Sequence, residues 1–309
     1  MIVCCGEALI DMIPTGDAEA GQSLTPHAGG AVFNTAIGLG RLSVEASFLS
    51  GVSNDLFGKI LATRLEESRV ATDLLIRSDR PTTLAFVELE DGQASYVFYD
   101  ENTAGRMLDP NALPDVPDTA DAMYFGGISL INAPAADFYV ALAQRESPQR
   151  VIVCDPNIRA NFIKDEAAYR ARLEKLIAVV DILKVSDVDL DWLVPGPASH
   201  LEKAASLRGA GPSIVVLTRG SDGACAVFGE NEIVEVPIEK VQVADTVGAG
   251  DTFNSGFLAH LSKEGLLKKD GIKNLAADDI QAALRLGAKV AAVTVSRAGA
   301  NPPWLHELS

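Results

Sequence analysis

The chain has 309 residues, of which 48% are hydrophobic and 22% charged, a composition typical of a globular protein with a large core. Its 26 lysines and arginines face 42 aspartates and glutamates, and a net charge of −16 without any basic cluster argues against a nucleic-acid surface or an anchor on an anionic membrane. No apolar run reaches the roughly 18 residues of a membrane span and the N-terminus lacks a signal-peptide pattern, so we expect a cytoplasmic protein.

Residues 1–5 predict a buried strand, and Asp11 stands in the apolar run that follows it. Strand ends are where α/β sheets keep their binding sites. A solitary carboxylate among apolar residues needs hydrogen-bond donors, which the hydroxyls of a polyol would supply. A turn or capping aspartate is the alternative interpretation.

Gly29 and Gly30 precede a predicted helix that carries Asn34 in its first turns. Paired glycines let a ligand approach the backbone closely, and the amide of Asn34 offers both donors and acceptors. This pattern suits the binding of a neutral sugar, although a helix that merely begins after a glycine turn would read the same.

Residues 82–88 and 94–99 are rich in β-branched and aromatic residues and are joined through Asp91-Gly92, which predicts a β-hairpin. The hairpin lies between helix–strand units, so we expect it to project from the main sheet as a lid. The lid segments are about 12–28 and 82–106, and the two are expected to share a small sheet.

From residue 120 onward, predicted strands and helices alternate, which is typical of a parallel sheet with crossover helices. The strands are 122–125, 151–154, 182–185 and 214–217, and the helices are 135–145, 166–179 and 201–207. A short hairpin, 224–228 with 232–236, and two helices, 252–263 and 278–296, complete the chain. No repeat or linker divides the sequence, so we expect one domain over residues 1–309.

Several of these strands are followed by residues whose side chains suit binding or catalysis. Arg159 follows the strand 151–154, where its guanidinium would face a substrate or a transferring phosphoryl group. Ser186 and Asp189 follow the next strand, where the carboxylate would hold magnesium through water or cap the next helix. The loop 218–223 would approach nucleotide phosphates, but a plain glycine turn explains it equally well.

The stretch Asp245-Thr246-Val247-Gly248-Ala249-Gly250-Asp251-Thr252-Phe253-Asn254 opens a predicted helix. Gly248 and Gly250 permit backbone N–H groups to converge ahead of the helix, and a helix N-terminus favours an anion such as phosphate. Asp251 would repel that phosphate unless it takes a proton from a nucleophile attacking it. The chain contains neither a Walker A loop nor a complete G-x-G-x-x-G, so phosphate binding here is of another kind.

The glycine pair with Asn34-Thr35-Ala36 near the N-terminus and the stretch 245–253 near the C-terminus resemble the two signatures of the ribokinase-like (PfkB) carbohydrate kinase family. The resemblance runs essentially the whole chain. It implies a three-layer α/β/α fold with a mostly parallel sheet and a β-sheet lid, and an ATP-dependent sugar kinase.

The resemblance also implies roles for individual residues. Asp251 would be the catalytic base, and Gly248, Ala249 and Gly250 the anion hole. Substrate-binding residues would be Asp11, Gly29, Gly30, Asn34, Phe98, Arg106 and Arg159, and nucleotide-binding residues would be Lys184, Ser186, Thr218, Gly220 and Gly223.

The family often shows an N-x-x-E motif that organises magnesium, and Ser186 and Asp189 stand at the matching positions. The shorter side chain puts direct contact of Asp189 with Mg²⁺ in doubt. Many relatives use a monovalent cation, and Asp245, the carbonyl of Val247 and the loop 296–300 would form such a K⁺ site.

Within the family the motifs look most like those of fructokinases. The nearest rival is 2-keto-3-deoxygluconate kinase, which commonly places an arginine where this chain has Asp100; an acid there favours a neutral sugar, although Arg106 could compensate. A ribokinase or nucleoside kinase and a non-catalytic sugar sensor of the same fold are further alternatives. The lid sheet would be a natural homodimer surface.

Overall fold

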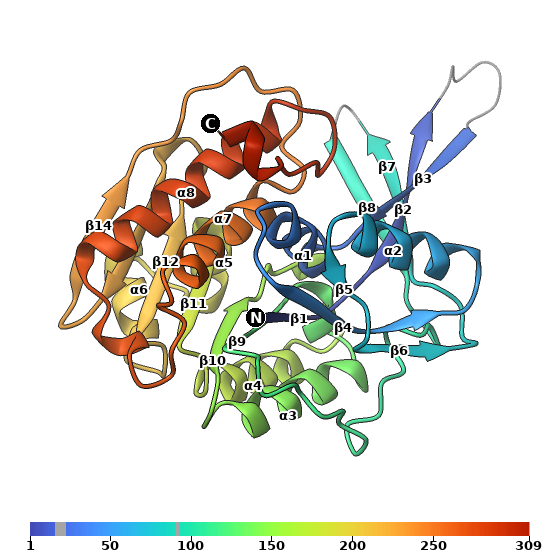
Figure 1. The fold of residues 1–309 in the computed structure, drawn as a ribbon, viewed down its shortest axis with the longest axis horizontal. Helices are drawn as coiled ribbons and strands as arrows, with labels where there is room; N and C mark the ends of the chain where they lie inside the picture. Colours follow the sequence, from blue (N-terminus) through green and yellow to red (C-terminus); the bar gives the residue numbers. More distant parts are fainter. Residues whose placement is uncertain (16–22, 91–92, 309) are drawn as a thin grey trace.

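The computed structural model describes residues 1–15, 23–90 and 93–308, and Figure 1 shows a large sheet flanked by helices with a small sheet projecting from it. The large sheet has ten strands: β1 (Ile2–Cys5), β4 (Ala46–Ser53), β5 (Val70–Ala71), β6 (Leu75–Ser78), β9 (Ala122–Gly126), β10 (Val151–Asp155), β11 (Ile182–Ser186), β12 (Ile214–Thr218), β13 (Ala224–Phe228) and β14 (Glu232–Val236). The small sheet consists of β2 (Leu9–Thr15), β3 (Ser23–Gly29), β7 (Leu84–Glu90) and β8 (Gln93–Tyr99).

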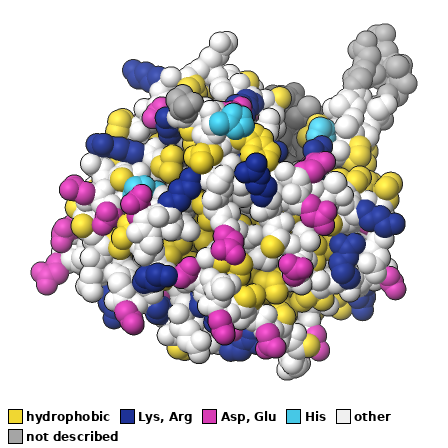
Figure 2. Space-filling model, in the orientation of Figure 1, with side chains coloured by type: hydrophobic (Ala, Val, Ile, Leu, Met, Phe, Trp, Pro, Cys, Tyr) yellow, Lys and Arg dark blue, Asp and Glu magenta, His cyan; other side chains and the backbone are white. Residues whose placement is uncertain are grey.

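The α-helices that the structure describes are α1 (Ala31–Arg41), α2 (Leu56–Glu67), α3 (Ala135–Glu146), α4 (Glu166–Ile177), α5 (Asp187–Leu193), α6 (His200–Arg208), α7 (Ala249–Lys263) and α8 (Ala277–Val295). None of these described helices is both long and apolar enough to cross a membrane. Acidic and basic side chains are intermingled on the face shown in Figure 2, in keeping with a sequence that has no basic cluster.

The order of the large sheet is β14-β13-β12-β11-β10-β9-β1-β4-β5, with β6 also paired to β4. β1 pairs in parallel with both β4 and β9, so that Cys5 lies opposite Leu49 on one side and Phe125 on the other. The order of the strands therefore reverses at β1. In open α/β sheets, ligands bind at such a reversal, outside the carboxyl ends of the strands.

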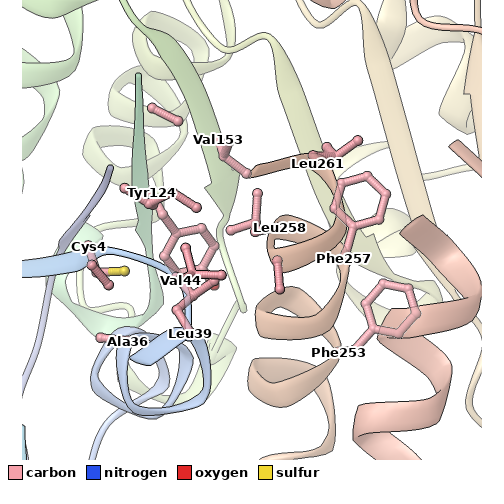
Figure 3. Packing of buried hydrophobic residues seen from close by; sticks show 14 of the residues in the cluster. Cys4, Ala36, Leu39, Val44, Tyr124, Val153, Phe253, Phe257, Leu258 and Leu261 are labelled. Atoms are coloured by element: carbon pink, nitrogen blue, oxygen red, sulfur yellow. The ribbon is translucent and has the colours of Figure 1, made fainter. Parts of the chain in front are cut away.

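Alternate residues of the strands point to opposite faces of the large sheet, and helices cover both faces. Ile2 and Cys4 of β1 pack with α1, α7 and α8, whereas Val3 and Cys5 pack with α3, α4 and α6. Figure 3 shows the first of these layers, in which Leu258 of α7 lies over the sheet. The expected three-layer α/β/α architecture is confirmed.

The small sheet has the order β3-β2-β7-β8. β7 and β8 form the predicted antiparallel hairpin, and β2 pairs in parallel with β7, so the two lid segments do share a sheet. Asp11 lies within β2, not in a loop after β1. The turn Asp91-Gly92 and residues 16–22 of the first lid segment lie outside the described residues.

Helices α7 and α8 approach each other at two glycines. A Cβ atom on Gly256 would lie 2.6 Å from the carbonyl oxygen of Leu286 and 2.8 Å from the Cα of Gly287. Both are shorter than any van der Waals contact, so only a residue without a side chain allows this approach.

We expect Gly256→Ala to lower the free energy of unfolding by about 1–3 kcal/mol, because the overlap with α8 outweighs the higher helix propensity of alanine. Gly271→Ala is the matched control, since the nearest atom to a Cβ there is 3.7 Å away. Urea unfolding measures both. Equal stabilities of the two variants would show that the approach of α8 does not constrain position 256.

Candidate active site

Two cavities meet at the N-terminus of α7. The smaller, of about 270 Å³, lies between the small sheet and the large sheet, and the larger, of about 790 Å³, extends along α7 and α8. Both are lined by Asn157, Lys184, Thr246, Ala249 and Gly250. A group held at this junction can reach a molecule in either cavity.

Gly248 caps the first turn of α7 in a left-handed conformation, with φ of +77°. A Cβ atom there would lie 2.5 Å from the Cβ of Ala300, so both its backbone angle and its surroundings require glycine. No side chain caps this helix end. Gly248, Ala249 and Gly250 all line the smaller cavity, which therefore receives the positive end of the helix dipole.

Asp251 is buried in the first turn of α7 and also lines the smaller cavity. Its Oδ2 accepts a hydrogen bond of 2.9 Å from Nδ2 of Asn34, at the start of α1. Among the described residues, Asn34 alone donates to this carboxylate. Burial raises the pKa of Asp251 to about 6, while the Asn34 hydrogen bond and the charges of Lys184 and Arg159 lower it.

A buried ion pair lies beside Asp251. The Nζ atom of Lys184 donates to Oδ2 of Asp155 at 2.8 Å, and Nδ2 of Asn254 donates to the same oxygen at 2.8 Å. Burial lowers the pKa of Lys184, but the charge and hydrogen bond of Asp155 raise it by more. The ammonium group lies 3.3 Å from the position that a Cβ on Gly250 would occupy, at the end of α7.

The structure brings most of the predicted substrate residues to the smaller cavity: Asp11, Gly30, Asn34, Phe98 and Arg159 line it. Burial raises the pKa of Asp11 to about 6, and no described residue donates a hydrogen bond to its carboxylate. Gly29 lies behind it, because a Cβ at Gly29 would be only 2.2 Å from its Oδ2.

Arg106 does not line either of these cavities. Its Nη1 donates to Oδ1 of Asp100 at 2.9 Å, and Nδ2 of Asn132 donates to the other oxygen of Asp100. Asp100 itself lines a separate cavity of about 460 Å³ behind Phe98. Its charge is therefore neutralised and does not face the smaller cavity.

The predicted nucleotide residues Lys184, Ser186, Thr218, Gly220 and Gly223 all line the larger cavity. Its other walls are mainly apolar, which suits a planar base.

Ser186 and Asp189 form a capping box at the start of α5. The carboxylate of Asp189 accepts hydrogen bonds from the backbone of Ile158 and from both N–H and Oγ of Ser186. The capping alternative is thus what the structure contains.

Asp245 joins two loops beside the end of α7. Its oxygens accept hydrogen bonds from the N–H groups of Val247, at 3.0 Å, and Gly299, at 2.8 Å. Within the described residues, no group of three or more His, Cys, Asp or Glu side chains is arranged to hold a metal ion.

Sequence reasoning missed two acidic residues of the smaller cavity, Glu7 and Asp155. Asp155 ends β10, and its place at the carboxyl end of a parallel strand is the signal that could have identified it. Glu7 follows β1 in the same way. Asp155 pairs with Lys184, and Glu7 accepts a hydrogen bond from the start of α1. No local sequence pattern indicates either contact.

The model of the pfkB family of carbohydrate kinases matches residues 1–307. A fructokinase from Rhizobium leguminosarum bv. trifolii is 47% identical over 276 residues, covering 89% of this chain and 84% of that protein. The fructokinase of Xylella fastidiosa with bound ATP superposes with a TM-score of 0.87 at 27% identity, covering 99% of this chain and 96% of that chain. A fructokinase double mutant from Vibrio cholerae O395, with fructose, ADP and potassium ion bound, superposes with a TM-score of 0.81 at 26% identity, covering 97% and 93%.

Because the pKa of Asp251 is raised from 3.8 to about 6 on folding, its contribution favours the folded state in acid and is lost as the pH rises through about 6. We expect wild type to lose about 1–2 kcal/mol of unfolding free energy relative to Asp251→Asn between pH 5 and pH 8. Urea unfolding at both pH values measures this, with the exposed Asp118→Asn as control. A difference that stays constant with pH would contradict the raised pKa.

Proposed function

Because the chain belongs to the pfkB family of carbohydrate kinases, we propose that this ATP-dependent sugar kinase transfers the γ-phosphoryl group of ATP to a hydroxyl of fructose. The similarity to fructokinases in sequence and in structure supports fructose as the acceptor. We place the reaction in the cytoplasm, which holds the ATP pool.

The observation that carries the proposal is the position of Asp251, buried in the sugar-sized cavity beside the point where the larger cavity begins. We assign the sugar to the smaller cavity and the nucleotide to the larger one. Asn34 holds Oδ2 of Asp251, which leaves Oδ1 to accept the proton of the attacking hydroxyl. With a pKa of about 6, the carboxylate is ionised at neutral pH and is still basic enough to take that proton.

The transferring phosphoryl group carries negative charge through the reaction, and the donors at the junction would stabilise it. The backbone of Gly248, Ala249 and Gly250 forms one wall. Lys184 supplies a cation next to that wall, and Arg159 supplies a second cation within the smaller cavity. We propose that these groups hold the phosphoryl group in line with the sugar hydroxyl.

Magnesium would arrive with ATP, and it would supply further positive charge at the phosphates. We propose that Asp189 reaches it through water, since its carboxylate is held in the capping box of α5 and by the N–H of Ile158. For potassium we propose Asp245 and the carbonyl of Val247, because each Asp245 oxygen accepts only one hydrogen bond and keeps a lone pair for a cation.

The charge of the smaller cavity favours a neutral sugar over a keto acid. Asp11 faces the cavity without a hydrogen-bond donor from any described residue, so it would attract sugar hydroxyls and repel a substrate carboxylate. Asp100 does not contribute to this preference, because its carboxylate is paired with Arg106 and lines the separate cavity behind Phe98.

We also propose that the chain forms a homodimer through the small sheet. Leu24, Val97 and Tyr99 are large hydrophobic residues on its strands that remain exposed, Tyr99 to 60%. Sedimentation velocity should show a dimer in wild type and more monomer in Tyr99→Lys; monomer alone in wild type would rule this surface out.

An assay coupled to ADP release tests the proposed function. With MgATP we expect turnover with fructose well above that with 2-keto-3-deoxygluconate, ribose, tagatose, adenosine or no sugar. Turnover confined to the keto acid would keep the kinase and overturn the sugar. No sugar-dependent turnover across the panel, together with calorimetric binding of a sugar, would favour a sensor.

In the same assay Asp251→Asn should lower kcat by 10²- to 10⁴-fold, because the substituted amide cannot accept the proton of the hydroxyl. Asp118→Asn is the control with unchanged kcat. An Asp251→Asn variant that keeps more than about a tenth of wild-type kcat would remove Asp251 from the role of base.

A further inference from the structure

Glu7 occupies the crevice at the reversal of the sheet. It follows β1, while the turn Gly127–Leu130 follows the neighbouring strand β9, and the chain leaves these two strands in opposite directions. The side chain is buried, and the residue lines the smaller cavity. It is therefore a buried acid at the place where this type of sheet binds its ligands.

The carboxylate of Glu7 joins two elements. Oε1 accepts a hydrogen bond of 2.9 Å from the N–H of Ala31, the first residue of α1, and Oε2 accepts one of 3.3 Å from the N–H of Ser129. α1 has no side-chain cap of its own and no acidic residue in its first turn. Glu7, which follows β1, supplies that missing acceptor.

The backbone around Glu7 is shaped to receive it. A Cβ atom on Gly127 would lie 2.1 Å from Oε1, and one on Gly30 would lie 3.1 Å from Cγ. Both glycines have positive φ, of +67° and +112°. The two turns can close on the carboxylate only because neither carries a side chain.

We propose that Glu7 is a positioning residue, whose ionised carboxylate holds the first turn of α1, and hence Asn34 and the catalytic Asp251, against the turn that follows β9. Asn34 lies within one turn of Ala31, and its own N–H bonds to the carbonyl of Gly30. Asn34 in turn donates to Asp251. The inference rests on the proposed role of Asp251 as the base.

The same arrangement makes activity depend on the ionisation of Glu7. Burial raises its pKa to about 7, hydrogen bonds from Ser129 and Ala31 lower it, and the charge of Asp251 on α7 raises it. Tyr139 on α3 faces it as well but is neutral in this range, and Asp11 on β2 lines the same cavity. As the pH falls through about 7, the carboxylate becomes protonated and accepts hydrogen bonds less strongly. It then no longer holds the first turn of α1 against the turn that follows β9.

Glu7→Gln tests the proposal, because the amide keeps one acceptor and turns an NH₂ group toward the other N–H. We expect kcat to fall about 10- to 100-fold at pH 8 with less than about a twofold change in the KM for ATP. The acid limb of the kcat profile should also move down by about one pH unit, since the group with a pKa of about 7 is gone and Asp251, with a pKa of about 6, remains. Glu146→Gln is the matched control, since Glu146 is a buried acid paired with Arg150 and lines neither cavity.

Hydrogen exchange gives a readout that does not depend on turnover. Amide hydrogens of residues 31–34 should exchange at least about tenfold faster in Glu7→Gln than in wild type. Their exchange rates in Glu146→Gln should equal those of wild type. Wild-type exchange in this turn, or wild-type kcat with an unmoved acid limb, would overturn the positioning role. If wild type turns over no sugar of the panel, the proposed function is overturned instead. The exchange result would still decide whether Glu7 holds the first turn of α1.

If Glu7→Gln does not fold, Gly127→Ala serves in its place. Its Cβ would displace the carboxylate while leaving the charge of Glu7 intact. Faster exchange of residues 31–34 with a reduced kcat supports the proposal, and wild-type values of both contradict it.

Discussion

The hydrogen bond between Asn34 and Asp251 is the interaction on which the rest of the site depends. It joins the first turn of α1 to the first turn of α7, two helices far apart in the sequence that pack side by side on one face of the large sheet. Thr35 and Ser255 reinforce it, since the hydroxyl of Thr35 donates to the backbone carbonyl of Asp251 and the hydroxyl of Ser255 donates to the backbone carbonyl of Thr35. The carboxylate of Asp251 is thus fixed by helix packing and not by a loop, which keeps its geometry precise.

This geometry requires buried charge. Asp251, Asp155 and Glu7 lie within one small cavity, and two cations, Lys184 and Arg159, line it too. Burial of a carboxylate raises its pKa and costs stability unless donors compensate. The donors here are backbone N–H groups, the side chains of Asn34 and Asn254, and the ammonium group of Lys184. Buried charges of this kind lower the free energy of unfolding but provide the groups that a reaction needs.

The small sheet and the large sheet make different contributions. The large sheet brings strand ends together and so supplies the acids, the lysine and the helix N-terminus. The small sheet places Asp11 and Phe98 over the opening of the smaller cavity. Ile128, in the turn that Glu7 holds, lines both this cavity and the one behind Phe98. We therefore expect the groups that bind the acceptor to come from both sheets, and those that activate it to come from the large sheet alone.

The sequence by itself determined the α/β alternation, the β7–β8 hairpin and the glycine turn that places Asp251 at the start of α7, because periodicity, glycine spacing and helix starts are local. It did not reveal that Arg106 pairs with Asp100, or that Glu7 and Asp155 belong to the site. The contacts of Glu7 with Ala31 and Ser129, and of Asp155 with Lys184, join residues distant in the chain. The order of the strands and the packing of α1 against α7 decided them, since only tertiary structure brings the ends of separate strands to one crevice.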